Sequence, residues 1–385
     1  MLLPDLVAAA KKQRARHDVP SVAHGTGVGC VGIRDNATAA ANSHRLPRSP
    51  AGRFVRVSDS ATAACRACGS SGSFAPVRTR EMMFGSRDAF DYVECAACGT
   101  VQITEIPAPD VLAAHYPADY YSFQEGPATH WRARARRWLE TQRDRAVAGR
   151  SNPVGAALAR KRPSFLLETV LASGIRPEQR IVDVGCGSGQ LLDRLARLGY
   201  RSLLGADPFI PADTRTPAGV EIRKSVVADL AGPFDVVMFN HSLEHVPDPV
   251  ADLRHAAALL APGGLCVVRL PTSGSKAWRT YRENWVQLDA PRHLVVPSRT
   301  GMSEMARRAG LDLVRTVDDS SSFQFVVSEL YQRDIAYYVP GTTSPTPVIA
   351  TLFSERRMAE LEAEARELNA RGDGDQAMFL LRPAS

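Results

Sequence analysis

The clearest hydrophobic pattern of the chain lies in residues 181–209. Ile181 to Val184 form a short apolar run, which predicts a buried strand. Leucines then recur at helical spacing and predict an amphipathic helix over residues 190–198, at positions Leu191, Leu192, Leu195 and Leu198. A second strand follows and ends at Asp207. Since a glycine-rich turn separates the first strand from the helix, the stretch predicts a βαβ unit that can hold a ligand at the turn.

The alternation of apolar strands and helices continues to the end of the chain. We expect a helix from residue 163, and strands at residues 226–228, 234–240, 265–270, 311–317 and 377–382. Strands that alternate with helices in this way form a parallel, doubly wound sheet. The sequence therefore predicts an α/β fold with a Rossmann-like sheet over residues 163–385, closed at one edge by a final pair of strands.

Two Cys-x-x-Cys pairs precede this region, with 26 residues between them, and each pair is followed by a glycine. The residues are Cys65, Cys68, Gly69, Cys95, Cys98 and Gly99. Glycine permits the positive φ of a tight turn, and four thiolates complete a closed tetrahedral site. We predict a small module over residues 61–125, resembling a zinc ribbon, that holds structural Zn²⁺. Disulfides are the alternative, and a reducing compartment disfavours them.

Composition and the distribution of charge argue against membrane, secreted and nucleic-acid-binding proteins. No apolar run approaches the eighteen residues of a membrane span, and the N-terminus lacks the basic start of a signal peptide, so we expect a cytoplasmic protein. Residues 1–60 hold nine Lys/Arg and four Asp/Glu, which accounts for +5 of the formal net charge of +6. We predict that they form a disordered basic leader. The near-neutral remainder argues against nucleic acid as a partner.

Residues 126–162 are predicted to be a basic linker with a helix over residues 130–150. Trp131 and Trp138 lie on one side of that helix, among arginines. Such a helix can bind a membrane surface or RNA. We favour a linker helix that buries both tryptophans against its own chain.

The glycine-rich turn distinguishes between two classes of nucleotide-binding protein. A dinucleotide fingerprint needs a third glycine where this chain has Gln190 or Leu192. The pattern Asp-x-Gly-x-Gly-x-Gly, from Asp183 to Gly189, instead resembles motif I of class I S-adenosylmethionine-dependent methyltransferases. The segment "SLEHVPDP", which begins at Ser242, is similar to methyltransferases of the methyltransferase-11 and -23 type.

This resemblance implies an S-adenosylmethionine site. Its expected residues are Asp183, Gly185, Gly187, Gly189, Asp207, Asp229 and Asn240. By the resemblance, the glycines line the methionine and ribose parts, and Asp207 binds the ribose hydroxyls. Asp229 lies near the adenine amine, and Asn240 lies by the methyl group.

An oxygen or carbon acceptor loses a proton when it is methylated, so a base near the methyl group is expected. The candidates are His241, His245 and His293, because histidine titrates near neutrality. A structural role for His245 is equally compatible with the sequence.

A loop over residues 281–298 combines polar and aromatic residues after the fifth strand of the sheet. Its candidate substrate-binding residues are Tyr281, Trp285, Gln287, Asp289 and Arg292. The alternative is an ordinary loop whose tryptophan belongs to the core.

The four-cysteine module followed by this catalytic domain is similar to bacterial methyltransferases of sugar and polysaccharide pathways. The resemblance implies a small-molecule acceptor, such as the hydroxyl or carbon of a nucleotide-sugar, a saccharide or a secondary metabolite. Two alternatives stay open, an RNA methyltransferase and a catalytically silent zinc-binding adaptor. The sequence makes no prediction of oligomeric state.

Overall fold

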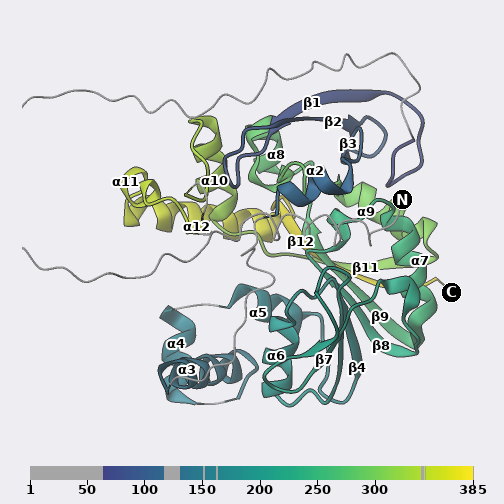
Figure 1. The fold of residues 1–385 in the computed structure, drawn as a ribbon. Coiled ribbons are helices and arrows are strands. Elements are labelled where there is room, and N and C mark those ends of the chain that lie inside the picture. Colours follow the sequence, from purple (N-terminus) through teal and green to yellow (C-terminus); the bar gives the residue numbers. More distant parts are fainter. Residues whose placement is uncertain are drawn as a thin grey trace, which may run out of the picture.

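The computed structural model describes residues 64–116, 131–150, 152–161, 164–339, 342 and 344–384 (Figure 1). The predicted leader over residues 1–60 lies outside these ranges. The described part contains a sheet of eight strands and a second sheet of four strands.

The eight-stranded sheet has the order β11-β12-β9-β8-β4-β5-β7-β6. Its strands are β4 (Arg180–Val184), β5 (Ser202–Ala206), β6 (Thr214–Arg215), β7 (Glu221–Arg223), β8 (Phe234–Asn240), β9 (Leu260–Pro271), β11 (Leu311–Asp318) and β12 (Gln376–Pro383). The central strands β7, β5, β4, β8 and β9 run parallel, whereas β12 and β11 pair antiparallel at one edge. This is the predicted doubly wound sheet with its final pair of strands, so the fold class is confirmed.

Helices cover both faces of the sheet because its strands are apolar on both sides. Successive residues of β8 illustrate this, since Val237 belongs to the core cluster under α7 and α9 and Val236 to the cluster under α5 and α6. The helices that pack around the sheet are α5 (Phe165–Ala172), α6 (Gln190–Arg197), α7 (Pro249–Leu259) and α9 (Arg299–Arg308). Figure 1 shows α6 and α7 on opposite sides of the strands.

One predicted strand is wrong. Residues 226–228 do not form a strand, because Val227–Asp229 make a 3₁₀ turn, η2. The strand of this region is β7, which lies earlier in the chain and pairs with β5. Asp229 is therefore the last residue of this turn, which follows β7 in the chain, rather than the end of a strand.

The second sheet joins the N-terminal module to the larger domain. Its order is β1-β2-β3-β10, with β1 (Phe74–Arg80), β2 (Ala89–Cys95) and β3 (Val101–Ile103) from the module. The fourth strand, β10 (Val295–Val296), comes from the loop after β9 and pairs with β3. A segment from the predicted catalytic region thus completes the sheet of the predicted zinc module.

A third core cluster fills the space between this small sheet and the C-terminal helices. Those helices are α8 (Lys276–Tyr281), α10 (Phe323–Gln332), α11 (Val348–Leu352) and α12 (Glu355–Arg371), with short turns η4 (Arg282–Asn284) and η5 (Val286–Leu288). The other elements are α2 (Pro109–Ala114) and the turn η3 (Leu243–His245). Trp278 and Trp285 lie at the centre of this cluster, with ring centroids 5.6 Å apart.

The basic linker forms a helical hairpin of α3 (Trp131–Val147) and α4 (Pro153–Lys161), beside α6 (Figure 1). Asp144 of α3 is buried and accepts two hydrogen bonds of 2.8 Å from Arg194 of α6. The expectation that α3 buries its tryptophans is wrong, because Trp131 is 67% and Trp138 55% exposed. The helix is anchored by an ion pair rather than by its aromatic side chains.

In the described ranges, no helix is both long enough and apolar enough to cross a membrane.

We predict that Asp144→Ala lowers the free energy of unfolding by about 3 kcal/mol, because it leaves Arg194 without its buried partner. Burial alone would raise the pKa of Asp144, but Arg194 and Arg143 lower it, which shows how strongly the carboxylate is paired. Urea unfolding measures the cost. Glu140→Ala is the matched control, since its exposed pair with Arg136 is worth no more than about 0.5 kcal/mol. Equal costs for the two variants would contradict the anchor.

Candidate functional site

The glycine-rich turn lies between β4 and α6, at the carboxyl end of the parallel strands. Gly185, Gly187 and Gly189 all have positive φ, at 75°, 57° and 77°. A Cβ on Gly185 would lie 2.3 Å from the Cβ of Ser242, in the loop that follows β8. The Ser242 hydroxyl also donates to the Val184 carbonyl at 2.6 Å. The turn therefore keeps its shape only with glycine, and it is fixed against the loop that carries the histidines.

Two buried carboxylates lie beside this turn. Asp207 accepts hydrogen bonds of 2.8 Å from the amides of Gly187 and Phe209. Asp183 is 2% exposed, and its Oδ1 has no hydrogen-bond partner among the described residues. Burial, together with the charge of Asp207, raises the pKa of Asp183 to about 8. A buried acceptor without a partner costs free energy, so this oxygen is suited to a ligand that brings a donor or a positive charge.

The other two predicted cofactor residues have different surroundings. Asp229 is exposed in the turn η2. Asn240 ends β8 and accepts a hydrogen bond of 3.3 Å from Arg269, whose guanidinium also pairs with Asp319 at 2.5 Å. Both residues follow parallel strands at the same end of the sheet as the glycine turn.

The three predicted histidines surround one carboxylate, Glu244, which is fully buried in η3. His241 Nδ1 lies 3.1 Å from Glu244 Oε1, and His293 Nε2 lies 3.9 Å from the same oxygen. Glu244 Oε2 has no hydrogen-bond partner among the described residues. Burial by itself would raise the pKa of Glu244, but the hydrogen bond from His241 and the charges of the three histidines lower it to about 2.

His241 occupies a special backbone position. Its φ is 52°, which is unusual for a residue other than glycine, and such strain concentrates at functional sites. The ionised carboxylate of Glu244 can only accept, so His241 donates from Nδ1 and its Nε2 carries the lone pair. The side chain is 30% exposed, more than that of His293. His241 can therefore accept a proton from a bound molecule.

His245 and His293 are oriented by backbone carbonyls. His245 Nδ1 lies 2.9 Å from the Arg292 carbonyl and His293 Nδ1 2.8 Å from the Gln287 carbonyl, so both rings donate from Nδ1. The two rings meet edge to face, with centroids 4.7 Å apart. Burial and the charge of His293 lower the pKa of His245, which favours the neutral form of its ring.

Arg292 ties this histidine cluster to the N-terminal module. Its buried guanidinium pairs with Glu81 at 2.9 Å and with Asp289 at 2.5 Å, and it donates to the His115 carbonyl at 2.9 Å. The hydroxyl of Tyr92 in β2 donates to the His293 carbonyl at 2.9 Å. The module is therefore in direct contact with the backbone that positions two of the histidines.

The loop residues predicted to bind substrate lie in two settings. Trp285 is 1% exposed and donates to Asp375, and Tyr281 is also buried in the third core cluster. Asp289 and Arg292 are paired with each other, and Gln287 holds His293 through its carbonyl. A role for these five residues in substrate binding stays a prediction.

Two groups of side chains in the described residues have metal-ligand geometry: the four cysteines, and Glu244 with His245 and His293. The Sγ atoms of Cys65 and Cys98 are 3.7 Å apart, and those of Cys68 and Cys95 are 3.8 Å apart. A tetrahedron with Zn–S bonds of about 2.3 Å has edges of about 3.8 Å, so the four thiols fit Zn²⁺. Gly69 and Gly99 have the expected positive φ, at 78° and 73°.

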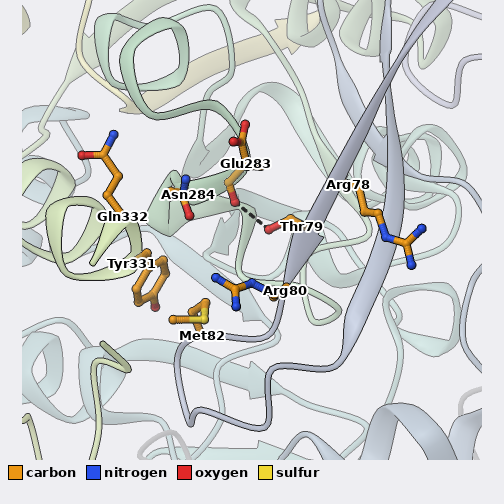
Figure 2. Close-up of a pocket in the computed structure, with 8 residues that line it drawn as sticks. All are labelled: Arg78, Thr79, Arg80, Met82, Glu283, Asn284, Tyr331 and Gln332. Atoms are coloured by element: carbon orange, nitrogen blue, oxygen red, sulfur yellow. Dashed lines mark hydrogen bonds between the residues drawn. The ribbon is translucent and has the colours of Figure 1, made fainter. Parts of the chain in front are cut away.

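A separate cavity of about 250 Å³ lies between β1 and the segment around η4 and α10. Figure 2 shows the side chains that line it. It is lined by Arg78, Thr79, Arg80, Met82, Glu283, Asn284, Tyr331 and Gln332. None of the histidines or turn glycines contributes to its wall. The cavity therefore does not mark the glycine and histidine site.

Two residues of the candidate site, Glu244 and Glu81, were not predicted from the sequence. A signal for Glu244 was present, because a carboxylate between two histidines in "HSLEH" can orient either ring. Glu81 offers no such signal, since it lies 211 residues from Arg292 in the chain.

The central part of this chain is similar to known proteins. Residues 156–316 match the family described as Methyltransferase domain. A ubiquinone biosynthesis O-methyltransferase of Caulobacter sp. (strain K31) is 39% identical over 127 residues, which cover 28% of this chain and 50% of that protein. The enzyme of the same name from Xanthomonas campestris pv. campestris (strain B100) is 33% identical over 37% of this chain and 59% of its own length. The match thus spans between 50% and 59% of the length of these relatives.

Solved structures give a weaker likeness. A SAM-dependent methyltransferase from Thermotoga maritima has a TM-score of 0.37 and 16% identity, over 65% of this chain and 95% of its own. The 1,6-didemethyltoxoflavin-N1-methyltransferase of Burkholderia thailandensis has a TM-score of 0.33 and 16% identity, over 68% and 94%. Scores this low carry no argument about substrate.

The Glu244 carboxylate predicts a pH-dependent contribution to stability. Its folded-state pKa of about 2 lies below its ordinary value of 4.5, so it stabilises the fold above pH 4.5 and ceases to do so as the pH falls from 4.5 to 2. Glu244→Gln should therefore lower the free energy of unfolding by about 1–3 kcal/mol at pH 6. Urea unfolding at several pH values should show this difference vanish towards pH 2. A difference that is the same at every pH would contradict the proposed electrostatic role.

Proposed function

Because this chain contains a methyltransferase domain over residues 156–316, we propose that it transfers a methyl group from S-adenosylmethionine to a small-molecule acceptor. The atom that is methylated is a hydroxyl oxygen or a carbon. The observation that carries this proposal is the cluster of His241, His245 and His293 around buried Glu244, directly after β8.

The glycine turn and its carboxylates fit the cofactor. The turn approaches the histidine loop so closely that a Cβ at Gly185 would collide with it, and Asp183 offers a buried oxygen without a partner. Asp183 and Gly185, Gly187 and Gly189 would hold the methionine part, whereas Asp207 and Asp229 would hold the ribose and the adenine. Asn240 would lie by the methyl group. When bound, S-adenosylmethionine supplies an electrophilic methyl group and leaves as a neutral thioether.

The histidine cluster supplies the base. His241 accepts the proton of the acceptor at Nε2, because Nδ1 is engaged by Glu244. Glu244 stabilises the imidazolium that results, in the way that a buried carboxylate orients a catalytic histidine. His245 and His293 are held by carbonyls next to the same carboxylate, so either can assist the proton transfer or contact the acceptor.

Two classes of acceptor have support. The four-cysteine module favours a sugar, as in the methyltransferases of polysaccharide pathways that its sequence resembles. The names of the curated relatives favour a ring hydroxyl of a quinone precursor instead. Both acceptors present an oxygen whose proton a histidine can remove.

Transfer of labelled methyl groups tests the proposal. Host extract is incubated with methyl-labelled S-adenosylmethionine and the chain, then separated into water-soluble small molecules, lipids and RNA. We expect label in one of the first two fractions, and the fraction assigns the acceptor class. Label in RNA, or no transfer together with no binding of S-adenosylmethionine, would overturn the proposal.

We predict that His241→Ala lowers kcat by about 10²–10⁴-fold, because the acceptor loses its base. S-adenosylmethionine affinity should stay within a few-fold. His245→Ala and His293→Ala, measured beside it, rank the three rings. His255→Ala is the matched control, since His255 is an exposed histidine of α7. A His241→Ala enzyme as active as the control would remove His241 from the role of base.

We further propose that Cys65, Cys68, Cys95 and Cys98 hold a structural Zn²⁺. All four thiols belong to the protein, so the ion has no open position for a substrate. Neighbouring groups support the site, because Arg308 of α9 donates to the Ala67 carbonyl at 2.7 Å and Ser273 donates to the Gly99 carbonyl at 2.7 Å.

Metal analysis should find one zinc per chain, and Cys65→Ser should lose it. Hydrogen exchange in that variant should rise first in residues 64–103 and in β10, which pairs with β3. Cys266→Ser serves as the control, because Cys266 is a buried cysteine outside the cluster. Zinc retained by Cys65→Ser would refute the site.

A further inference from the structure

We propose that the helical hairpin of α3 and α4 docks the chain on an anionic membrane surface. The proposal rests on the outer face of α3, which we define as Trp131, Arg134, Trp138 and Arg145. These four side chains are exposed, and their spacing of three, four and seven positions places them along one side of the helix.

The helix is fixed so that this face stays outward. Asp144 pairs with Arg194 of α6, and Val147 packs against the core cluster beneath α5 and α6. Both contacts lie on a different side of α3 from the tryptophans. Figure 1 shows the hairpin beside α6, at the end of the molecule away from the four-stranded sheet. These two contacts therefore hold α3 so that its outer face points away from the core cluster.

The net charge of the hairpin indicates which kind of partner it binds. Residues 131–162 contain ten Lys/Arg and two Asp/Glu, a net +8 in a chain whose total is +6. The leader over residues 1–60 is also basic, so its charge does not complement the hairpin. An anionic surface does complement it, because each Lys or Arg near such a membrane adds to the electrostatic attraction.

The apolar residues favour lipid over nucleic acid. Tryptophan partitions to the boundary between headgroups and acyl chains, where its ring is apolar and its N–H can hydrogen-bond. Leu139 and Val154 of the same hairpin are also exposed, at 40% and 48%, and aliphatic side chains do not stack on bases. The helix has 17 residues and is about 25 Å long, so its outer face can contact lipid headgroups along several turns.

The four tryptophans of the chain make the test direct. Trp278 and Trp285 are 1% exposed, so a blue shift of the emission on binding reports Trp131 and Trp138. The full chain is mixed with vesicles of phosphatidylcholine, with or without phosphatidylglycerol. We expect sedimentation and a blue shift only with phosphatidylglycerol, and weaker binding as salt rises.

Variants separate the outer face from general charge. Arg134→Glu with Arg145→Glu should weaken vesicle binding by roughly tenfold or more, and Trp131→Ser with Trp138→Ser should abolish the blue shift. Arg307→Glu with Arg356→Glu changes the net charge equally at side chains that are 68% and 90% exposed elsewhere, and it should bind almost as the wild type does.

Three results would overturn the proposal: no binding to anionic vesicles, equal loss in both charge-reversed variants, or tighter binding to poly(uridylic acid) than to the vesicles. The last result would make the hairpin a nucleic-acid surface.

Discussion

The buried ion pairs of Arg292 are the interaction on which the candidate site depends. The guanidinium joins Glu81 of the N-terminal module to Asp289 of the loop after β9, and no part of it reaches solvent. A buried charge must be paired, because a buried charge without a partner carries a large desolvation cost. Neither segment can therefore move away without leaving a charged group buried and unpaired. Because the Arg292 carbonyl also receives His245 Nδ1–H, the same residue that joins the segments orients a ring of the histidine cluster.

This arrangement connects the N-terminal module to the backbone that carries two of the candidate histidines. The strand β10 completes its sheet, Tyr92 holds the His293 carbonyl, and the cysteine turns are bonded to α9 and to the loop before α8. A module that is separate in sequence is thus in direct contact with the candidate site.

The opposite end of the molecule follows a different principle. There α3 is attached through the buried ion pair of Asp144 and through the packing of Val147, and its two tryptophans are exposed. Asp144 and Val147 lie on a different side of α3 from Trp131 and Trp138, so both contacts form while the two tryptophans stay exposed. Charged side chains therefore occur in two different settings in this chain. In the interior, Arg292 is paired with Glu81 and Asp289, and on the outer face of α3 the arginine side chains are exposed.

The sequence by itself determined the elements whose signals are local. The βαβ unit around Gly185, the parallel sheet and the paired cysteines depend on spacing within a few residues, and their geometry is as expected. Tertiary structure alone decided the contacts made across long separations: Glu81 with Arg292, β3 with β10, and three histidines around Glu244. It also overturned two local inferences, the strand at residues 226–228 and the burial of Trp131 and Trp138. The physical reason is that pairing and burial depend on which surfaces meet, and a one-dimensional pattern does not contain that information.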